Sequence, residues 1–382
     1  MTVFPRCRRC AVGALLATFA VLAPAALGQE VIRFAAKGQV PAGYPAQYAA
    51  LIAAAEQEGQ LVVHSTTDLG IVAPVIEDFQ AMFPRIEVIY RDMNSTDLYN
   101  GYLADVATSP TTADVLWSSA MDLQFRVANA GNAQPYDSPE GGAFPAWARW
   151  KNVAFGTTYE PVAVVYNARL LGAEEVPRTH ADLARLLVDK RDRFAGKVVT
   201  YDIERSGLGL MLAVQDERAF PGFWPLVAAL GGTTAQTVAT TEGMLARVGS
   251  GSDVIAYNAL GTYARAESSR NPAVAFTHLN DYTLVVTRVM LIGKKAANPN
   301  AARLWVDYLL SKRGQGMLAN RALLFSLRED VEGPNSGGAA AKALGGSARP
   351  IPLGPELIAP FPDPAARLAF IAKWQKAIGA QR

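Results

Sequence analysis

The chain is poor in the residues that usually carry redox, metal or covalent chemistry. It has two cysteines, Cys7 and Cys10, and three histidines, His64, His180 and His278. None of the histidines lies in an HExxH pattern, no serine lies in a GxSxG turn, and no phosphate-binding loop with a GK[ST] sequence is found. We therefore predict that the protein is not an enzyme and that it has no cofactor and no metal site.

Long apolar runs are also lacking, with one exception close to the N-terminus. The run Ala11–Leu27 follows Arg6, Arg8 and Arg9 and ends at Gly28. It is shorter than the about 20 residues that a membrane-spanning helix needs, and its layout is that of a secretory signal peptide. We predict that residues 1–28 are cleaved near Gly28 and that the protein is periplasmic, exported by general secretion or by the twin-arginine route.

An excess of basic charge is missing as well. Cleavage would remove three of the 36 basic residues, which leaves 33 against 34 acidic residues and a net charge of −1 in place of +2. Proteins that bind nucleic acid or anionic membranes usually carry a basic excess or cluster. We therefore expect neither partner and no stable membrane insertion. Both cysteines would leave with the peptide, so the mature chain is predicted to have no disulfide.

The remaining chain of about 350 residues is long enough for two domains. Short apolar stretches alternate with amphipathic helical segments along it, and this order is typical of α/β folds with mostly parallel sheets flanked by helices. We predict two lobes joined by two crossovers. The first lobe comprises residues 29–158 and 283–330, the second residues 159–282, and residues 331–382 form a flexible link, an extended arm and a C-terminal helix that packs on the body.

Polar turns follow several predicted strands, and each of them opens a helix. In open parallel sheets, ligands bind outside the carboxyl ends of the strands, where helix N-termini offer N–H groups and a partial positive charge. The alternative is that these residues simply cap their helices. The predicted ligand-binding residues of the turns are Ser65, Thr66, Thr67, Ser95, Thr96, Ser118, Ser119, Arg205, Ser206 and Gly207.

Four further residues are candidates for ligand contact. Tyr257 and Asn258 end a strand of the second lobe, where they either close on a ligand or merely terminate the strand. Tyr282 precedes the return strand and has the same two interpretations. Arg288 lies in an otherwise apolar strand, so it either neutralises an anionic ligand, as Arg205 also could, or belongs to a structural ion pair.

The order and spacing of several segments resemble a known family. These segments are Leu61–Val63, Ala113–Ser118, Pro161–Asn167, Asn298–Ala302 and Leu309–Gln315. Together they are similar to periplasmic solute-binding proteins of the ferric-iron-binding type, which serve ABC importers. The resemblance implies a type 2 periplasmic-binding-protein fold with two hinge crossovers that closes around its ligand, acts as a monomer and docks on a membrane permease.

The resemblance also bears on the ligand. Ferric-iron binders of this family use adjacent tyrosines, often with histidine and glutamate, but this chain has Tyr257-Asn258 and Ser118-Ser119 at those places. Fe(III) prefers hard anionic oxygens, so these differences favour the branch similar to sugar-phosphate, phosphoglycerate and phosphonate binders. We therefore expect a small anionic solute. The alternative is Fe(III), bound by Tyr257, Tyr282 or Tyr263 with a synergistic anion.

Overall fold

The computed structural model describes residues 39–379, so the predicted signal peptide, its cleavage site and the two cysteines lie outside the described residues. Within this range the chain forms two seven-stranded sheets, each flanked by helices. The prediction of a two-lobed α/β fold is thus confirmed. No helix in the described range is both long enough and apolar enough to cross a membrane.

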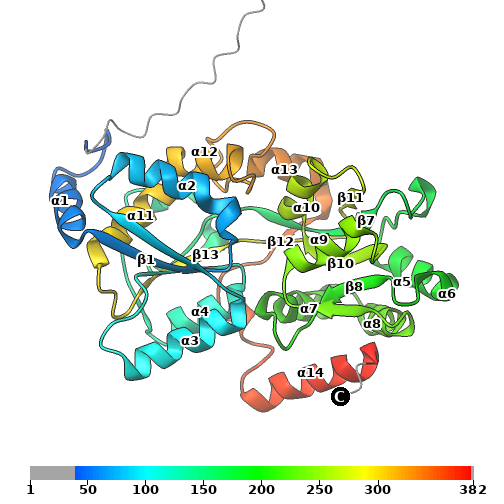
Figure 1. Cartoon of the computed structure of the whole chain (residues 1–382). Coiled ribbons are helices and arrows are strands. Elements are labelled where there is room, and N and C mark those ends of the chain that lie inside the picture. Colours follow the sequence, from blue (N-terminus) through cyan, green and yellow to red (C-terminus); the bar gives the residue numbers. More distant parts are fainter. Residues whose placement is uncertain (1–38, 380–382) are drawn as a thin grey trace, which may run out of the picture. The chain divides into compact units, whose positions relative to one another are not determined.

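The first lobe is built on the sheet with strand order β2-β1-β3-β13-β6-β5, to which β4 adds through β13. Strands β1, β2 and β3 are parallel, whereas β13 runs antiparallel to β3 and β6. Figure 1 shows α3 and α4 on one face of this sheet and α2, α11 and α12 on the other. The bounds are α1 (Tyr48–Glu58), β1 (Gln60–Ser65), α2 (Leu69–Met82), β2 (Glu87–Asp92), α3 (Ser95–Thr108), β3 (Val115–Ser118), α4 (Met121–Asn129), β4 (Ala133–Gln134), β5 (Arg149–Trp150), β6 (Ala154–Gly156), β13 (Val289–Gly293), α11 (Pro299–Leu310) and α12 (Lys312–Asn320).

The second lobe has the sheet order β14-β12-β7-β10-β8-β9, and β11 pairs with β7. Strands β8, β9 and β10 are parallel, and β7 runs antiparallel to β10, β11 and β12. The bounds are β7 (Glu160–Asn167), α5 (His180–Asp189), α6 (Arg191–Phe194), β8 (Val198–Tyr201), α7 (Gly207–Ala219), α8 (Phe223–Gly232), β9 (Gln236–Val238), α9 (Thr241–Ser250), β10 (Ile255–Leu260), α10 (Gly261–Ser268), β11 (Val274–Thr277), β12 (Thr283–Val286) and β14 (Ala348–Pro350).

Local sequence explains these elements. In β1 every second side chain is buried, because Leu61 and Val63 face the core while their neighbours do not. In α2 the buried residues Val72, Val75, Ile76 and Phe79 recur at helical spacing. Helix α1 ends at Gly59, which has a positive φ of 71°. In this conformation its N–H donates a hydrogen bond to the carbonyl oxygen of Ala55, near the end of the helix.

The chain passes between the two sheets three times, the last time on its way from β13 to β14, and the first two crossovers are hydrogen-bonded to each other. One runs from β6 to β7 and the other from β12 to β13. The N–H of Thr157 donates to the carbonyl of Arg288 (2.9 Å), and the N–H of Arg288 donates to Thr158 Oγ1 (2.9 Å). The return strand is divided at Thr287-Arg288, so that its first part, β12, belongs to the second sheet and its second part, β13, to the first.

The C-terminal region also differs from expectation. The Gly- and Ala-rich segment predicted as a flexible link contains α13 (Gly337–Leu344), whose N-terminus is capped by Ser336 through the N–H of Ala339 (3.1 Å). The chain then adds β14 to the second sheet and ends in α14 (Pro364–Ile378). Helix α14 lies beside α8, with Ile371, Trp374 and Ile378 in the core of the second lobe (Figure 1).

Candidate functional site

A cavity of about 310 Å³ is lined by residues of both lobes. Most of its walls are formed where helices begin. Asp68 stands at the start of α2, Asn94 and Ser95 at the start of α3, Ser206 before α7 and Leu260 before α10. Helix α9 contributes its cap and first turn through the segment 240–242. The N-terminal ends of five helices therefore lie at one cavity.

On the first-lobe side, hydroxyl groups form the wall. Thr66 follows β1, and its Oγ1 accepts a hydrogen bond from the N–H of Ser119 (3.1 Å), which follows β3. The two hydroxyl oxygens lie 3.4 Å apart. The side chain of Asn94 caps α3 by accepting from the N–H of Asp97 (2.9 Å). This wall can therefore both donate and accept hydrogen bonds.

On the second-lobe side, two helix caps and two phenols line the cavity. Ser206 accepts from the N–H of Gly209 (3.1 Å), and Thr240 accepts from the N–H of Gly243 (3.1 Å). Tyr201 and Tyr263 complete this wall. Burial raises the pKa of both phenols well above the ordinary value, so both remain protonated at neutral pH. The hydroxyl of Tyr201 is hydrogen-bonded to Thr241 Oγ1, and that of Tyr263 contacts Asp68.

Arg288 lies at the edge of the cavity but its charge is already paired. The side chain is 1% exposed, and its Nε lies 2.8 Å from Glu160 Oε1, while Nη2 donates to Glu160 Oε2 (3.2 Å). Nη1 donates to Thr67 Oγ1 (2.8 Å) and to the carbonyl of Thr66 (3.3 Å). Burial lowers the pKa of Arg288, but the carboxylate of Glu160, together with the phenols of Tyr263 and Tyr90, outweighs burial, so the pKa is raised. Of the two interpretations of Arg288, the structural ion pair is the one that the structure contains.

Three carboxyl groups also line the cavity, those of Asp68, Asp92 and Glu242. Asp92 Oδ2 accepts from the N–H of Leu69 at the start of α2 (2.9 Å). The charge of Asp68, followed by burial, raises the pKa of Glu242. In the described range, no group of three or more histidine, cysteine, aspartate and glutamate residues is arranged to hold a metal ion.

Direct contacts join the two lobes around the cavity. Ser95 Oγ accepts from the N–H of Gly207 at the start of α7 (2.9 Å). The N–H of Asp68 lies 3.4 Å from the hydroxyl of Tyr263, to which it donates. A Cβ atom on Gly207 would lie 2.5 Å from Leu123 Cδ1 and 3.2 Å from Ser95 Oγ, so the absence of a side chain permits this close approach.

The structure brings only some of the predicted residues to the cavity. Thr66, Ser95, Ser119, Ser206 and Arg288 line it. Three of the other turn residues have their side chains hydrogen-bonded inside the protein: Ser65 accepts from the N–H of Thr67, Thr67 accepts from Arg288, and Ser118 accepts from the N–H of Ala120. The remaining three lie elsewhere. Gly207 packs on the first lobe, Thr96 lines another cavity, and Arg205 is exposed. Ser65 and Ser118 therefore bond within their turns and cap no helix, because the N-cap positions of α2 and α4 are Asp68 and Ala120. Ser206 is a predicted turn residue that does cap its helix, α7.

Tyr257, Asn258 and Tyr282 do not line the cavity. All three donate to the buried carboxylate of Asp216, with distances of 2.7 Å from Tyr257, 2.6 Å from Asn258 and 2.8 Å from Tyr282. His180 stacks on the ring of Tyr282 at 4.0 Å. Asn258 has a positive φ of 66° at an irregularity of β10, where its amide reaches Asp216. These residues form a polar cluster inside the second lobe.

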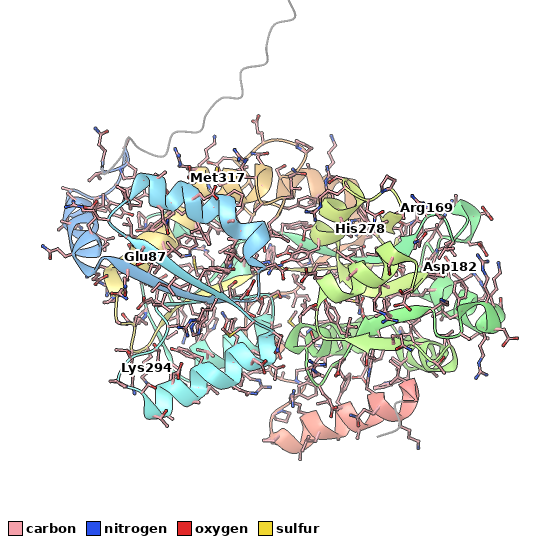
Figure 2. The ribbon with its side chains drawn as sticks, in the orientation of Figure 1. Glu87, Arg169, Asp182, His278, Lys294 and Met317 are labelled. Carbon is pink, nitrogen blue, oxygen red and sulfur yellow. The ribbon has the colours of Figure 1, made fainter. Side chains whose placement is uncertain are left out.

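Several lining residues were missed in the sequence. The turn Thr240-Thr241-Glu242 has the same signature as the predicted turns, a polar cap that opens a helix, but it follows the short strand β9, which has no strong apolar pattern. Asp68 and Asp92 lie next to predicted turns. None of the three histidines lines the cavity; His278, labelled in Figure 2, has its Nδ1 2.9 Å from the carbonyl oxygen of Val162.

The chain is similar to known bacterial solute-binding proteins. Residues 110–345 match the family described as bacterial extracellular solute-binding protein. The substrate-binding protein of an ABC transporter from Agrobacterium tumefaciens is 34% identical, with 84% of this chain and 94% of that chain covered and a TM-score of 0.80. No curated protein matches the sequence.

Two more distant structures share the fold. The periplasmic binding protein AfuA from Actinobacillus pleuropneumoniae, with exogenous fructose-6-phosphate bound, is 16% identical over 85% of this chain and 99% of that chain, with a TM-score of 0.67. Iron-bound HitA from Pseudomonas aeruginosa is 15% identical over 84% and 99%, with a TM-score of 0.63. At such identities the likeness concerns the fold alone.

Proposed function

The chain belongs to the bacterial extracellular solute-binding protein family, and from this premise we propose that it captures a small anionic solute of the organic phosphate type for an ABC importer. The related protein from Agrobacterium tumefaciens is described as the substrate-binding protein of such a transporter. We infer a periplasmic location, a permease in the cytoplasmic membrane as partner, and no chemical change in the solute.

The observation that carries this proposal is the convergence of five helix N-termini on the cavity. Each N-terminus carries a partial positive charge of about half an elementary charge together with N–H groups that lack partners within the helix. Several of them at one cavity favour an anion, because the field of each adds to the others. The hydroxyls of Thr66, Ser95, Ser119 and Ser206 supply the short polar contacts that phosphoryl oxygens accept.

The geometry favours an organic anion over ferric iron. The phenols of Tyr257 and Tyr282, which we considered as iron ligands, already donate to Asp216 and do not line the cavity. Tyr263 lines it, but burial raises its pKa, which disfavours the phenolate that Fe(III) prefers. An organic phosphate needs only donors, and the cavity supplies them.

Capture requires the lobes to open and close. The first two crossovers lie side by side, joined by hydrogen bonds between Thr157, Thr158 and Arg288, and they are the natural place for a hinge. The contact between Ser95 and Gly207 joins the lobes at the cavity. We infer that the described arrangement is the closed form and that a solute bound between the lobes stabilises it.

Thermal unfolding of the mature protein tests the proposal, because a ligand that binds only the folded protein raises the melting temperature. We expect a phosphate monoester, among sugar phosphates, phosphoglycerates, phosphonates, carboxylates and Fe(III), to give the largest increase. The Ser119→Asp variant places a carboxylate in the anion site and should lose that increase. A shift with Fe(III) alone, accompanied by a visible tyrosinate absorption band, would instead support the iron alternative.

A further inference from the structure

We propose that this chain has a second ligand site, apart from the cavity between the lobes, and that this site binds an α-amino acid with an apolar side chain. It lies between α3, α4 and the segment 361–367, which leads into α14. There Asp122 would bind the ammonium group, and Arg126 and Arg367 would bind the carboxylate. The segment 361–367 lies beyond residues 110–345, which match the family, and the inference does not depend on the proposed function.

The site is a cavity of about 350 Å³. This volume is at the lower end of the range of about 300–1,000 Å³ that is usual for small-molecule sites. Helices α3 and α4 of the first lobe form one wall, the segment 361–367 forms another, and Glu204 in the turn before α7 belongs to the second lobe. Arg126 holds the segment to α4, because its Nη2 donates to the carbonyl oxygen of Phe361 (3.1 Å). Three parts of the chain therefore border a space large enough for a small molecule.

Asp122 on α4 is the acidic group of this site. It lines the cavity, is 5% exposed, and has a buried Oδ1 with no hydrogen-bond partner in the described part of the chain. Thr96 on α3 lines the same cavity, and its buried hydroxyl also has no partner there. Such atoms are costly, because the polar groups of protein interiors are nearly always paired. An ammonium group in the cavity would supply Asp122 with the missing donor and with a charge of opposite sign.

The neighbouring arginine does not satisfy Asp122. Residues four apart lie on the same face of a helix, so Asp122 and Arg126 have the spacing of an ion pair. None joins them in the residues that the structure describes, and Arg126 is bound to Phe361 instead. Burial raises the pKa of Asp122 to about 6, even though nearby positive charges and backbone N–H groups lower it. The carboxyl group is therefore ionised at neutral pH, and its Oδ1 still lacks a donor.

Arg126 and Arg367 provide the positive charge at the cavity. Both line it and both are only partly buried, so a ligand can reach their N–H groups. Within the described range, neither of them forms an ion pair with a carboxylate. A guanidinium group presents a planar fork of donors that matches a carboxylate. The two arginines therefore favour a ligand that carries a carboxylate in addition to its ammonium group.

The other lining residues suit an apolar side chain. They include one aliphatic, two aromatic and two proline side chains: Leu123, Tyr99, Phe361, Pro362 and Pro364. Of the two further acids, Asp363 caps α14 by accepting from the N–H of Ala366 (2.8 Å), and Glu204 stands on the second-lobe side. An unpartnered carboxyl oxygen, two guanidinium groups and an apolar surface match the three parts of an apolar α-amino acid.

Titration calorimetry of the mature protein near neutral pH tests this site, with alanine, valine, leucine, methionine and phenylalanine as probes. We expect at least one of them to bind with one site per chain. Arg367→Met should weaken this binding at least about tenfold, because it removes a charged donor to the carboxylate. The matched control is Lys376→Met, which removes a positive charge from the same helix outside the cavity and should bind as the wild type does.

Analogues of the amino acid that binds most tightly separate the roles of the two charges. For leucine these are 4-methylpentanoate, which lacks the ammonium group, and 3-methylbutylamine, which lacks the carboxylate. Asp122→Asn should weaken binding of the amino acid at least about tenfold but not that of the carboxylate analogue, and Arg367→Met should spare the amine. Asp105→Asn on α3, outside the cavity, is the control for the loss of an acid.

Three results would overturn the inference. The first is that none of the five amino acids binds at millimolar concentration. The second is that Arg367→Met binds the amino acid as tightly as the wild type does. The third is that Ser119→Asp, which alters the cavity between the lobes, abolishes this binding, because the amino acid would then occupy that cavity instead. None of these results decides whether a phosphate ester binds between the lobes, so the proposed function is tested separately.

Discussion

Removal of the Arg288 side chain should be among the most destabilising single changes in this protein. Arg288→Met leaves Glu160 fully buried, with hydrogen bonds from Thr158 (2.7 Å) and Thr262 (2.9 Å) but without its cation. Loss of one partner of a buried ion pair typically costs about 3–5 kcal/mol, because the remaining charge is buried without compensation. Glu160 adjoins the first crossover and Arg288 the second, so the damage would fall on the proposed hinge.

Urea denaturation followed by far-UV circular dichroism measures this loss. With an m-value of about 3 kcal/mol/M, the midpoint should fall by about 1–1.7 M. The double variant Arg288→Met, Glu160→Gln buries no lone charge and should recover a substantial part of the loss. The control is Arg185→Met, which breaks the exposed pair with Asp182 and should cost about 0–1 kcal/mol. A midpoint for Arg288→Met within experimental error of that control would refute the reasoning.

Two further predictions concern lobe contact and pH. Gly207→Ala should weaken solute binding about tenfold in calorimetry. The new Cβ would lie 2.5 Å from Leu123 Cδ1, which can rotate away, but also 3.2 Å from Ser95 Oγ and 3.3 Å from Ala120 Cβ, so it would hold the lobes apart. The control is Gly232→Ala on α8, where a Cβ has room, and it should bind normally. Burial raises the pKa of Asp122 from 3.8 to about 6. The buried carboxyl group is therefore best tolerated when protonated, and the free energy of unfolding should fall as the pH rises from about 3.8 through about 6. Between acidic and neutral pH, the free energy of unfolding of Asp122→Asn should rise by up to about 3 kcal/mol relative to that of the wild type. Urea denaturation at several pH values measures this difference, and midpoints that change in parallel for the two proteins would contradict the prediction.

Most of the fold could be predicted because its main elements carry strong local signals. Helix α1 (Tyr48–Glu58), for example, has buried residues at helical spacing and ends at a glycine, Gly59. The weak elements were missed: β5 and β9 have two and three residues, too few to show a period. Helix α13 was missed because glycine and alanine suggested flexibility, whereas the close packing of Gly337 on the carbonyl oxygen of Ser326 needs a residue without a side chain.

The candidate site was predictable only where it follows parallel strands. Thr66 and Ser119 come directly after β1 and β3, so the rule about strand ends identifies them. The partner of Arg288 is 128 residues away in the sequence, and pairs that distant leave no local pattern. The same holds for Tyr257 and Tyr282, whose hydroxyls donate to Asp216 on α7 instead of facing the cavity. Their role as ligands was predicted from their positions beside strands as well as from the resemblance, and the contacts give it no support.

The most direct test of the central claim is calorimetric titration of a phosphate monoester, taken from the thermal panel, into the wild-type protein and the Ser119→Asp variant. If helix N-termini form an anion site at the cavity, the wild type should bind with one site per chain, and the variant should bind at least about a hundredfold more weakly, because like charges would meet at the place where the phosphate group binds. Equal affinities for the two proteins, at unchanged thermal stability without ligand, would show that the anion does not bind there.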